Sequence, residues 1–228
     1  MSEDEKIIFL HIPKTAGTSL RQIVEQEYQP ENCLFLYYPV YDEVTMEEIH
    51  LQLPKVKVLY GHLTFGIHEL LNITGKYVAF LRHPIDRVIS FYKYSACDLD
   101  SSYYTSIQNG LSLVDMLQQE VTIQTNNHMT RILANYWQED RLEDVQLVDR
   151  ALENILNNFY YVGLLERFNE SIEQLGKKLN WKTSYEIPYV NANTYERQLK
   201  IDSMTQAVLE QYNYLDLLLY EAIKSNFY

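Results

Sequence analysis

Cysteine, glycine, proline and long apolar runs are all scarce in this sequence. Its 228 residues include 2 Cys, 7 Gly and 6 Pro, which argues against disulfide-rich, collagen-like and linker-dominated proteins. Cys33 and Cys97 fit no metal-ligand spacing, so we expect both thiols to be reduced and buried. No apolar run approaches the ~20 residues needed to span a bilayer. With no signal or transit peptide evident at the start, we expect a soluble cytoplasmic protein with one domain over residues 1–228.

Positive charge is also in short supply. The chain has 19 Lys and Arg against 31 Asp and Glu, a formal net charge of −12. A broadly basic surface is therefore excluded, and neither nucleic acid nor an anionic membrane is expected as a partner. Any anion that this protein binds must be held by a few well-placed donors.

Short apolar runs alternate with longer segments of helical periodicity. This alternation predicts an α/β fold with a mainly parallel sheet flanked by helices and a helix-rich middle segment. Strands are expected over residues 6–11, 33–38, 56–60, 77–81 and 160–165. Helices are expected over 17–28, 45–53, 84–92, 112–120, 126–137, 143–159, 169–179 and 203–225, the second opened by a capping box of Thr45 and Glu48.

The turn after the first strand, Pro13 to Ser19, has the properties of an anion site. It leads into a helix, whose first N–H groups and dipole favour an anion. Lys14 adds a mobile charge, and Thr15, Thr18 and Ser19 add hydroxyl donors. The turn does not match G-x-x-x-x-G-K-[ST]. An ordinary helix start, with Thr15 or Thr18 as the N-cap and Lys14 in solvent, explains it equally well.

A second basic element follows the strand at 77–81. Arg82 stands at the carboxyl end of that strand, the side on which parallel sheets bind ligands. Pro84 suits the first helical position, and Ser90 lies about two turns further on. If this helix folds back beside the first turn, Arg82 and Ser90 can grip a second phosphate.

Together these segments resemble the sulfotransferase superfamily that uses 3′-phosphoadenosine 5′-phosphosulfate (PAPS), in particular the branch with the heparan sulfate 2-O- and 6-O-sulfotransferases and bacterial relatives. Residues 13–19 match the family's 5′-phosphosulfate turn, and Arg82, Pro84, Arg87 and Ser90 match its 3′-phosphate element. Residues 161–168 are also similar. The resemblance implies a P-loop-like sulfotransferase fold, with PAPS held by Lys14, Thr15, Ala16, Gly17, Thr18, Ser19, Arg82 and Ser90.

Sulfuryl transfer needs a base for the acceptor hydroxyl, and a neutral histidine suits that task. His62 ends the third strand on the ligand side and falls on the Gly-His segment that holds the base in the 2-O-sulfotransferases. His68 is a rival, whereas His11 is expected to support the phosphate turn. Lys14 would neutralise charge on the leaving group, and no metal is required. We interpret Asp98 and Asp100 as a solvated loop.

The acceptor side is less defined. Arg131 is either an acceptor contact or a surface residue of an amphipathic helix, and residues 191–194 are expected to close over the nucleotide. The expected acceptor carries a hydroxyl group, as a carbohydrate or small molecule does, and the acidic composition argues against a highly sulfated polyanion. Two alternatives stay open: a nucleotide-dependent kinase with an atypical phosphate loop, and a non-catalytic nucleotide-binding relative.

Overall fold

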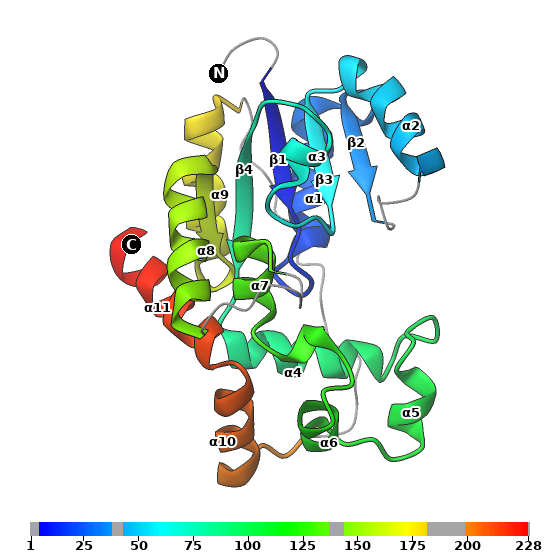
Figure 1. Ribbon diagram of the computed structural model, residues 1–228, viewed down its shortest axis with the longest axis vertical. Helices are drawn as coiled ribbons and strands as arrows, with labels where there is room; N and C mark the ends of the chain where they lie inside the picture. The colour runs from blue at the N-terminus through cyan, green and yellow to red at the C-terminus, as the bar shows by residue number, and fades with distance from the viewer. Residues whose placement is uncertain (1–4, 38–42, 137–143, 182–198, 228) are drawn as a thin grey trace.

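A parallel sheet lies at the centre of the computed structural model, which describes residues 5–37, 43–136, 144–181 and 199–227 (Figure 1). Within these residues the sheet has five strands in the order β2-β3-β1-β4-β5, and every pair is parallel. The predicted fold class is confirmed. The strands are β1 (Lys6–Leu10), β2 (Cys33–Leu36), β3 (Val58–Gly61), β4 (Gly75–Leu81) and β5 (Phe159–Leu164).

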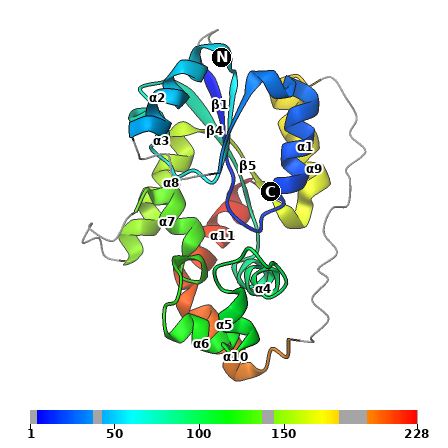
Figure 2. The ribbon, with the colours of Figure 1, turned by 90° about the vertical axis from the view of Figure 1, so that its right-hand side faces the viewer.

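Helices cover both faces of the sheet (Figure 2). On one face lie α1 (Gly17–Tyr28) and α9 (Phe168–Leu179), and on the other lie α2 (Glu43–Gln52), α3 (Ile67–Leu70), α7 (His128–Ala134), α8 (Asp144–Asn158) and α11 (Tyr214–Phe227). Because successive side chains of a strand point to opposite faces, Ile7 and Phe9 pack with α1 and α9, whereas Ile8 and Leu10 pack with the second group.

A third helical layer lies beyond the carboxyl ends of the strands (Figure 1). It contains α4 (Pro84–Ser95), α5 (Tyr104–Gln108), α6 (Leu113–Gln118) and α10 (Ser203–Tyr212). Val88, Met116 and Leu209 belong to its separate apolar cluster. The layer matches the predicted helix-rich middle, although the sequence did not predict the short helix α5. The 3-10 helices are η1 (Pro30–Asn32), η2 (Leu53–Lys55), η3 (Ile123–Thr125) and η4 (Leu165–Arg167).

Three local predictions are wrong. The helix expected over 203–225 is divided at Asn213, whose buried Nδ2 donates to the carbonyls of Thr125 and Leu209, both at 3.0 Å. Thr45 lies inside α2, which begins at Glu43, so it does not cap that helix. Cys97 is exposed, because it follows the last turn of α4; Cys33 is buried as expected. None of the helices in the described ranges is long and apolar enough to cross a membrane.

Candidate active site

Three of the predicted site segments meet at the carboxyl edge of the sheet. Leu10 pairs with Gly61 in β3 and with Ala79 in β4, so these three strands end close together. The turn that begins at His11 follows β1, His62 follows β3, and Arg82 follows β4. Gly61 is required where it stands, because a Cβ there would lie 1.8 Å from the Leu36 carbonyl oxygen. This edge is where parallel α/β sheets bind ligands.

The turn after β1 has an unusual backbone. Lys14 and Ala16 have φ angles of 72° and 68°, in the left-handed region that non-glycine residues rarely adopt. Alternation of this kind turns successive N–H groups into a concave anion-binding surface. Ala16 is the N-cap of α1, with no side-chain cap, so neither Thr15 nor Thr18 caps the helix. The Thr15 hydroxyl instead donates to the Ile12 carbonyl at 2.8 Å and stabilises the turn.

Two side chains, Tyr60 and His11, contact the residues of this turn. The buried Tyr60 of β3 donates from its hydroxyl to the Gly17 carbonyl at 2.6 Å. The His11 ring packs directly against Gly17, where an added Cβ would lie 1.7 Å from His11 Nε2. Burial, and then the neighbouring His62 and Lys14, lower the pKa of His11 to about 3. His11 is therefore a neutral support for the turn at physiological pH.

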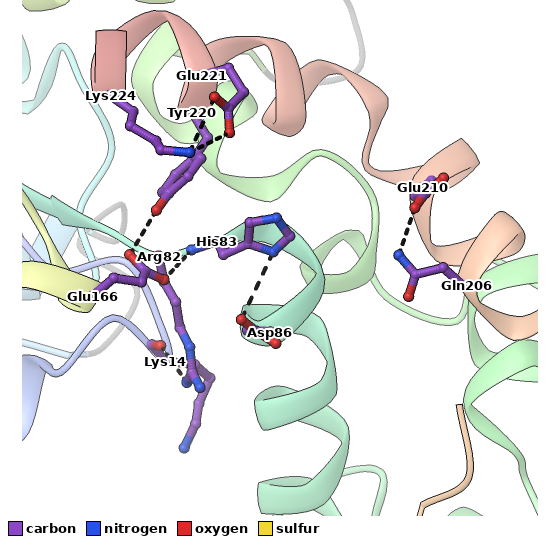
Figure 3. A network of polar contacts seen from close by, with 10 residues as sticks. All are labelled: Lys14, Arg82, His83, Asp86, Glu166, Gln206, Glu210, Tyr220, Glu221 and Lys224. Atoms are coloured by element: carbon purple, nitrogen blue, oxygen red, sulfur yellow. Dashed lines mark hydrogen bonds and ion pairs between the residues drawn. The ribbon is translucent and has the colours of Figure 1, made fainter. Parts of the chain in front are cut away.

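Arg82 connects the two basic elements. Its Nη1 donates to the Lys14 carbonyl at 3.3 Å (Figure 3). Burial and the nearby Arg82 charge lower the pKa of Lys14 to about 8, against a smaller opposing effect from Asp98. Two cations held this close repel each other, and an anion between them relieves that repulsion. The pair thus fits a phosphate-bearing ligand.

Glu166 holds the chain beside Arg82. Its carboxylate accepts from the His83 N–H at 2.6 Å and from the Tyr220 hydroxyl at 2.9 Å (Figure 3). It therefore joins η4, α11 and the start of α4, the helix that Pro84 opens. Ser90 lies further along α4 and is 6% exposed.

The two candidate bases have different surroundings. The His62 ring packs 4.7 Å from the His11 ring and 4.9 Å from the Tyr37 ring, between centroids. His62 is exposed to solvent on one side, yet the crowding of its other side lowers its pKa. His68 Nδ1 instead forms a 2.7 Å hydrogen bond with the Tyr77 hydroxyl, so its ring is engaged with β4.

A cavity of about 170 Å³ opens beside His62. The strand ends provide one wall, with His11, Pro13, His62, Leu63 and Thr64. The other wall comes from η3, α7 and Tyr136, two residues beyond the end of α7. Its residues are Ile123, Gln124, His128, Arg131, Ile132 and Tyr136. No acidic side chain is among these lining residues. A single ring of six atoms is of suitable size for this space.

Arg131 belongs to the second wall. Its Nε donates to the Asn126 carbonyl at 3.0 Å, and its guanidinium carbon lies 5.3 Å from the centre of the Tyr136 ring. The side chain is therefore held in place at the cavity. Residues 191–194, expected to close over the nucleotide, lie outside the described residues.

The sequence also matches a known family over nearly its whole length. The model of the family described as "Sulfotransferase family" covers residues 1–222. The chain belongs to this family. The predicted PAPS-dependent sulfotransferase superfamily is thereby confirmed, whereas the likeness to its heparan sulfate branch stays a prediction.

Solved structures provide a further comparison for this sulfotransferase. A sulfotransferase from Alicyclobacillus acidocaldarius aligns over 96% of this chain and 95% of its own, at 15% identity and a TM-score of 0.50, which supports the fold. Mouse sulfotransferase SULT7A1, solved in complex with PAP, aligns over 95% of this chain at 13% identity and a TM-score of 0.47. The alignment spans 66% of the mouse chain. Among curated proteins, none matches this sequence.

Several residues of the site were not predicted from the sequence. Tyr60 and Glu166 each contact a predicted element through a side chain that is distant in sequence. His128 lies in the helix predicted over 126–137, as Arg131 does, but its burial in the cavity wall is a property of the fold. In the described part of the sulfotransferase, no group of three or more His, Cys, Asp or Glu residues could hold a metal ion.

Proposed function

We propose that this sulfotransferase moves the sulfuryl group of PAPS to a hydroxyl group of an acceptor, a carbohydrate or small molecule, with His62 as general base. The observation that carries the proposal is the meeting of three groups at one sheet edge: the left-handed turn with Lys14, the Arg82 guanidinium, and the His62 ring beside a cavity. When bound, PAPS supplies an electrophilic sulfuryl group attached to a phosphate leaving group.

The nucleotide is assigned to the two basic elements. The backbone N–H groups of Thr15 to Ser19, with the hydroxyls of Thr18 and Ser19, hold the 5′-phosphate at the N-terminus of α1. Because the Thr15 hydroxyl donates to Ile12, Thr15 contributes its backbone N–H. Arg82 and Ser90 are assigned to the 3′-phosphate, where a planar guanidinium can form two parallel hydrogen bonds.

In the transfer, the acceptor oxygen forms a bond to sulfur as the bond from sulfur to the phosphate oxygen breaks. His62 accepts the proton of the attacking hydroxyl, which a ring with a lowered pKa can do at neutral pH. The Lys14 ammonium neutralises the charge that gathers on the departing oxygen. His11 stays neutral and therefore does not oppose the charge that develops on His62.

Nucleotide selectivity tests the binding assignment. 3′-Phosphoadenosine 5′-phosphate (PAP) should raise the Tm far more than ATP with Mg²⁺ does. The Arg82→Ala variant should lose this difference. Lys177→Ala, which removes an exposed cation of α9, is the control and should keep the difference in Tm between the two nucleotides. An equal response of the wild-type protein to both nucleotides would refute the assignment.

The base is tested by transfer of labelled sulfate from PAPS to a panel of hydroxyl acceptors, with products identified by mass. His62→Ala should lower kcat by about 100-fold or more, the scale of general base catalysis. His68→Ala is the matched control and should leave kcat within about 3-fold. Near-normal turnover of His62→Ala would place the base elsewhere.

A further inference from the structure

The ring of Tyr94 contacts the ammonium group that is assigned to the leaving oxygen. Nζ of Lys14 lies 3.9 Å from the centre of this ring. Tyr94 belongs to the last turn of α4, four residues beyond Ser90, and residues four apart share one face of a helix. Because a cation is attracted to an aromatic face, the ring holds the Lys14 ammonium beside the face of α4 that is assigned to the 3′-phosphate.

Tyr94 differs from the other aromatic residues of α4 in its exposure. Phe91 and Tyr92 are 7% and 5% exposed and belong to the apolar cluster of the third layer, whereas Tyr94 is 47% exposed. Removing a side chain that is this open to solvent should change stability little. An effect of such a substitution on the reaction can therefore be measured in a folded protein.

Asp98 lies beside the phenol group of Tyr94. A hydrogen bond to Asp98, followed by partial burial and the charges of Asp98 and Asp100, raises the pKa of Tyr94. The loop after α4 fixes Asp98 in turn, because its N–H donates to the Tyr94 carbonyl at 3.0 Å and its Oδ1 accepts from the Asp100 N–H at 3.2 Å. Asp100 is exposed, whereas Asp98 is half-buried. One carboxylate of this loop thus orients the ring that contacts Lys14.

The charges around Lys14 come from three elements. Burial, and then Arg82 after β4, lower the pKa of Lys14, whereas Asp98 after α4 raises it. His11, which precedes Lys14 in the turn, is neutral at physiological pH. The Tyr94 ring acts in the same direction as Asp98, because it attracts only the charged form. Tyr94 and Asp98 therefore favour a charged Lys14, against burial and Arg82.

We propose that Tyr94, oriented by Asp98, is a positioning residue for sulfuryl transfer, which holds the charged Lys14 ammonium at the turn where the leaving oxygen is bound. The proposal rests on the proposed function, because it takes Lys14 as the group that neutralises the departing oxygen. Tyr94 acts through Lys14. Its loss should slow transfer more than it weakens nucleotide binding, since Arg82 and the backbone N–H groups of the turn remain.

The first test separates rate from binding. Tyr94→Leu removes the aromatic face and should lower kcat by about 3–30-fold, the scale of a cation–π contact. The Kd of PAP should stay within about 3-fold by calorimetry, and the Tm reports folding. Tyr94→Phe keeps the ring and should lose less. Tyr214→Leu, at a tyrosine of α11 that is 56% exposed, should keep the wild-type kcat. An unchanged kcat in Tyr94→Leu, or an equal loss of PAP affinity, overturns the proposal.

The second test measures the protonation of Lys14 through the reaction. Removing the ring or the Asp98 charge removes a group that favours the charged form, so the pKa of Lys14 should fall below about 8. The alkaline decline of kcat/KM for PAPS should then move to lower pH, by at least about 0.4 unit in Tyr94→Leu, and in the same direction in Asp98→Asn. Asp100→Asn is the matched control and should keep the wild-type profile. A decline that both variants leave in place, or that Asp100→Asn moves as far, overturns the proposal.

A direct titration does not depend on turnover. In nucleotide-free protein labelled with ¹³C at lysine Cε, the Lys14 signal is identified by its loss in Lys14→Arg. Its titration midpoint should be lower in Tyr94→Leu than in wild type, and unchanged in Tyr214→Leu. Equal midpoints in wild type and Tyr94→Leu overturn the proposal. If the midpoint falls as expected but the protein transfers no sulfuryl group from PAPS, the positioning of Lys14 by Tyr94 stands and the proposed function fails.

Discussion

The ammonium nitrogen of Lys14 lies 3.9 Å from the centre of the Tyr94 ring. A cation over an aromatic face is attracted by about 0.5–2 kcal/mol. The charge of Arg82, whose Nη1 contacts the Lys14 carbonyl, disfavours the protonated form of Lys14. Burial disfavours that form more strongly. Lys14 is therefore a positioned cation whose pKa of about 8 lies close to physiological pH.

Activity should fall on the alkaline side as Lys14 loses its proton. Because the lowered pKa is that of the ligand-free enzyme, kcat/KM for PAPS should decline above about pH 8. On the acid side, kcat/KM should increase with rising pH as His62 loses its proton. The midpoint of this increase should lie below 6.5, the ordinary pKa of histidine. The check is a profile of kcat/KM from pH 5 to 10.

Lys14→Arg identifies the group behind the alkaline decline. Arginine stays charged to beyond pH 12, so this variant should be slower but flat from pH 7 to 10. The acid limb should be unchanged, since His62 is retained. An alkaline decline that persists in Lys14→Arg would assign it to another group.

Glu166 should contribute to stability through its hydrogen bonds to His83 and Tyr220. Glu166→Ala leaves the His83 N–H without this acceptor, and we expect a loss of about 1–3 kcal/mol in urea denaturation. Tyr220→Phe removes only one of the two bonds and should cost less. A Tyr220→Phe loss as large as that of Glu166→Ala would contradict this assignment.

The charge of Glu166 has a separate effect on the nucleotide. The Glu166 carboxylate favours the charged form of Arg82 and so raises the pKa of Arg82. Burial lowers that pKa by more. Glu166→Gln removes a negative charge near the proposed phosphate site and keeps an acceptor oxygen. PAP should therefore bind Glu166→Gln as tightly as wild type or more tightly, measured by calorimetry. Weaker binding would show that the charge itself holds Arg82 in position.

The sheet and the first phosphate element could be predicted because their signals are local. A short apolar run before a helix locates β1 and α1, and α1 has the predicted bounds of 17–28. By contrast, the division between α10 and α11 depends on Asn213 bonding to Thr125, 88 residues away in sequence. In an amphipathic run, a single Asn gives no sign of such a partner.

The same reason explains which site residues were missed. Lys14 and Arg82 belong to compact motifs, whereas His128 joins the cavity wall only because the fold buries its ring there. Tyr94 contacts Lys14 across 80 residues of sequence. Local patterns identify which residues carry charge, but burial and pairing arise only when distant segments pack.

Gly17 should be irreplaceable because of His11. The Cβ of Gly17→Ala would lie 1.7 Å from His11 Nε2, and we expect a loss of about 1–3 kcal/mol from overpacking. In His11→Ala the ring is absent, so adding Gly17→Ala should cost much less there. A double-mutant cycle of Tm and urea midpoints measures this coupling. Additive losses would show that the backbone, and not the ring, requires glycine.

Acid should destabilise the fold through His11. The folded-state pKa of about 3 lies below the ordinary 6.5, so between these values the unfolded chain binds a proton that the folded chain does not. Stability is therefore fully present above about pH 6.5 and declines as the pH falls towards 3. From pH 7 to 5 this one group accounts for at most about 2 kcal/mol. Urea denaturation at both pH values measures the change.

His11→Asn cannot titrate in this range, so its free energy of unfolding should fall less between pH 7 and 5 than that of wild type. His50→Asn is the matched control, because His50 is an exposed histidine of α2, and it should show the wild-type change. The buried His128, whose pKa is also lowered, acts in the same direction and leaves part of the acid sensitivity in His11→Asn. If His11→Asn and wild type lose equal stability, the proton taken up on unfolding belongs to other groups.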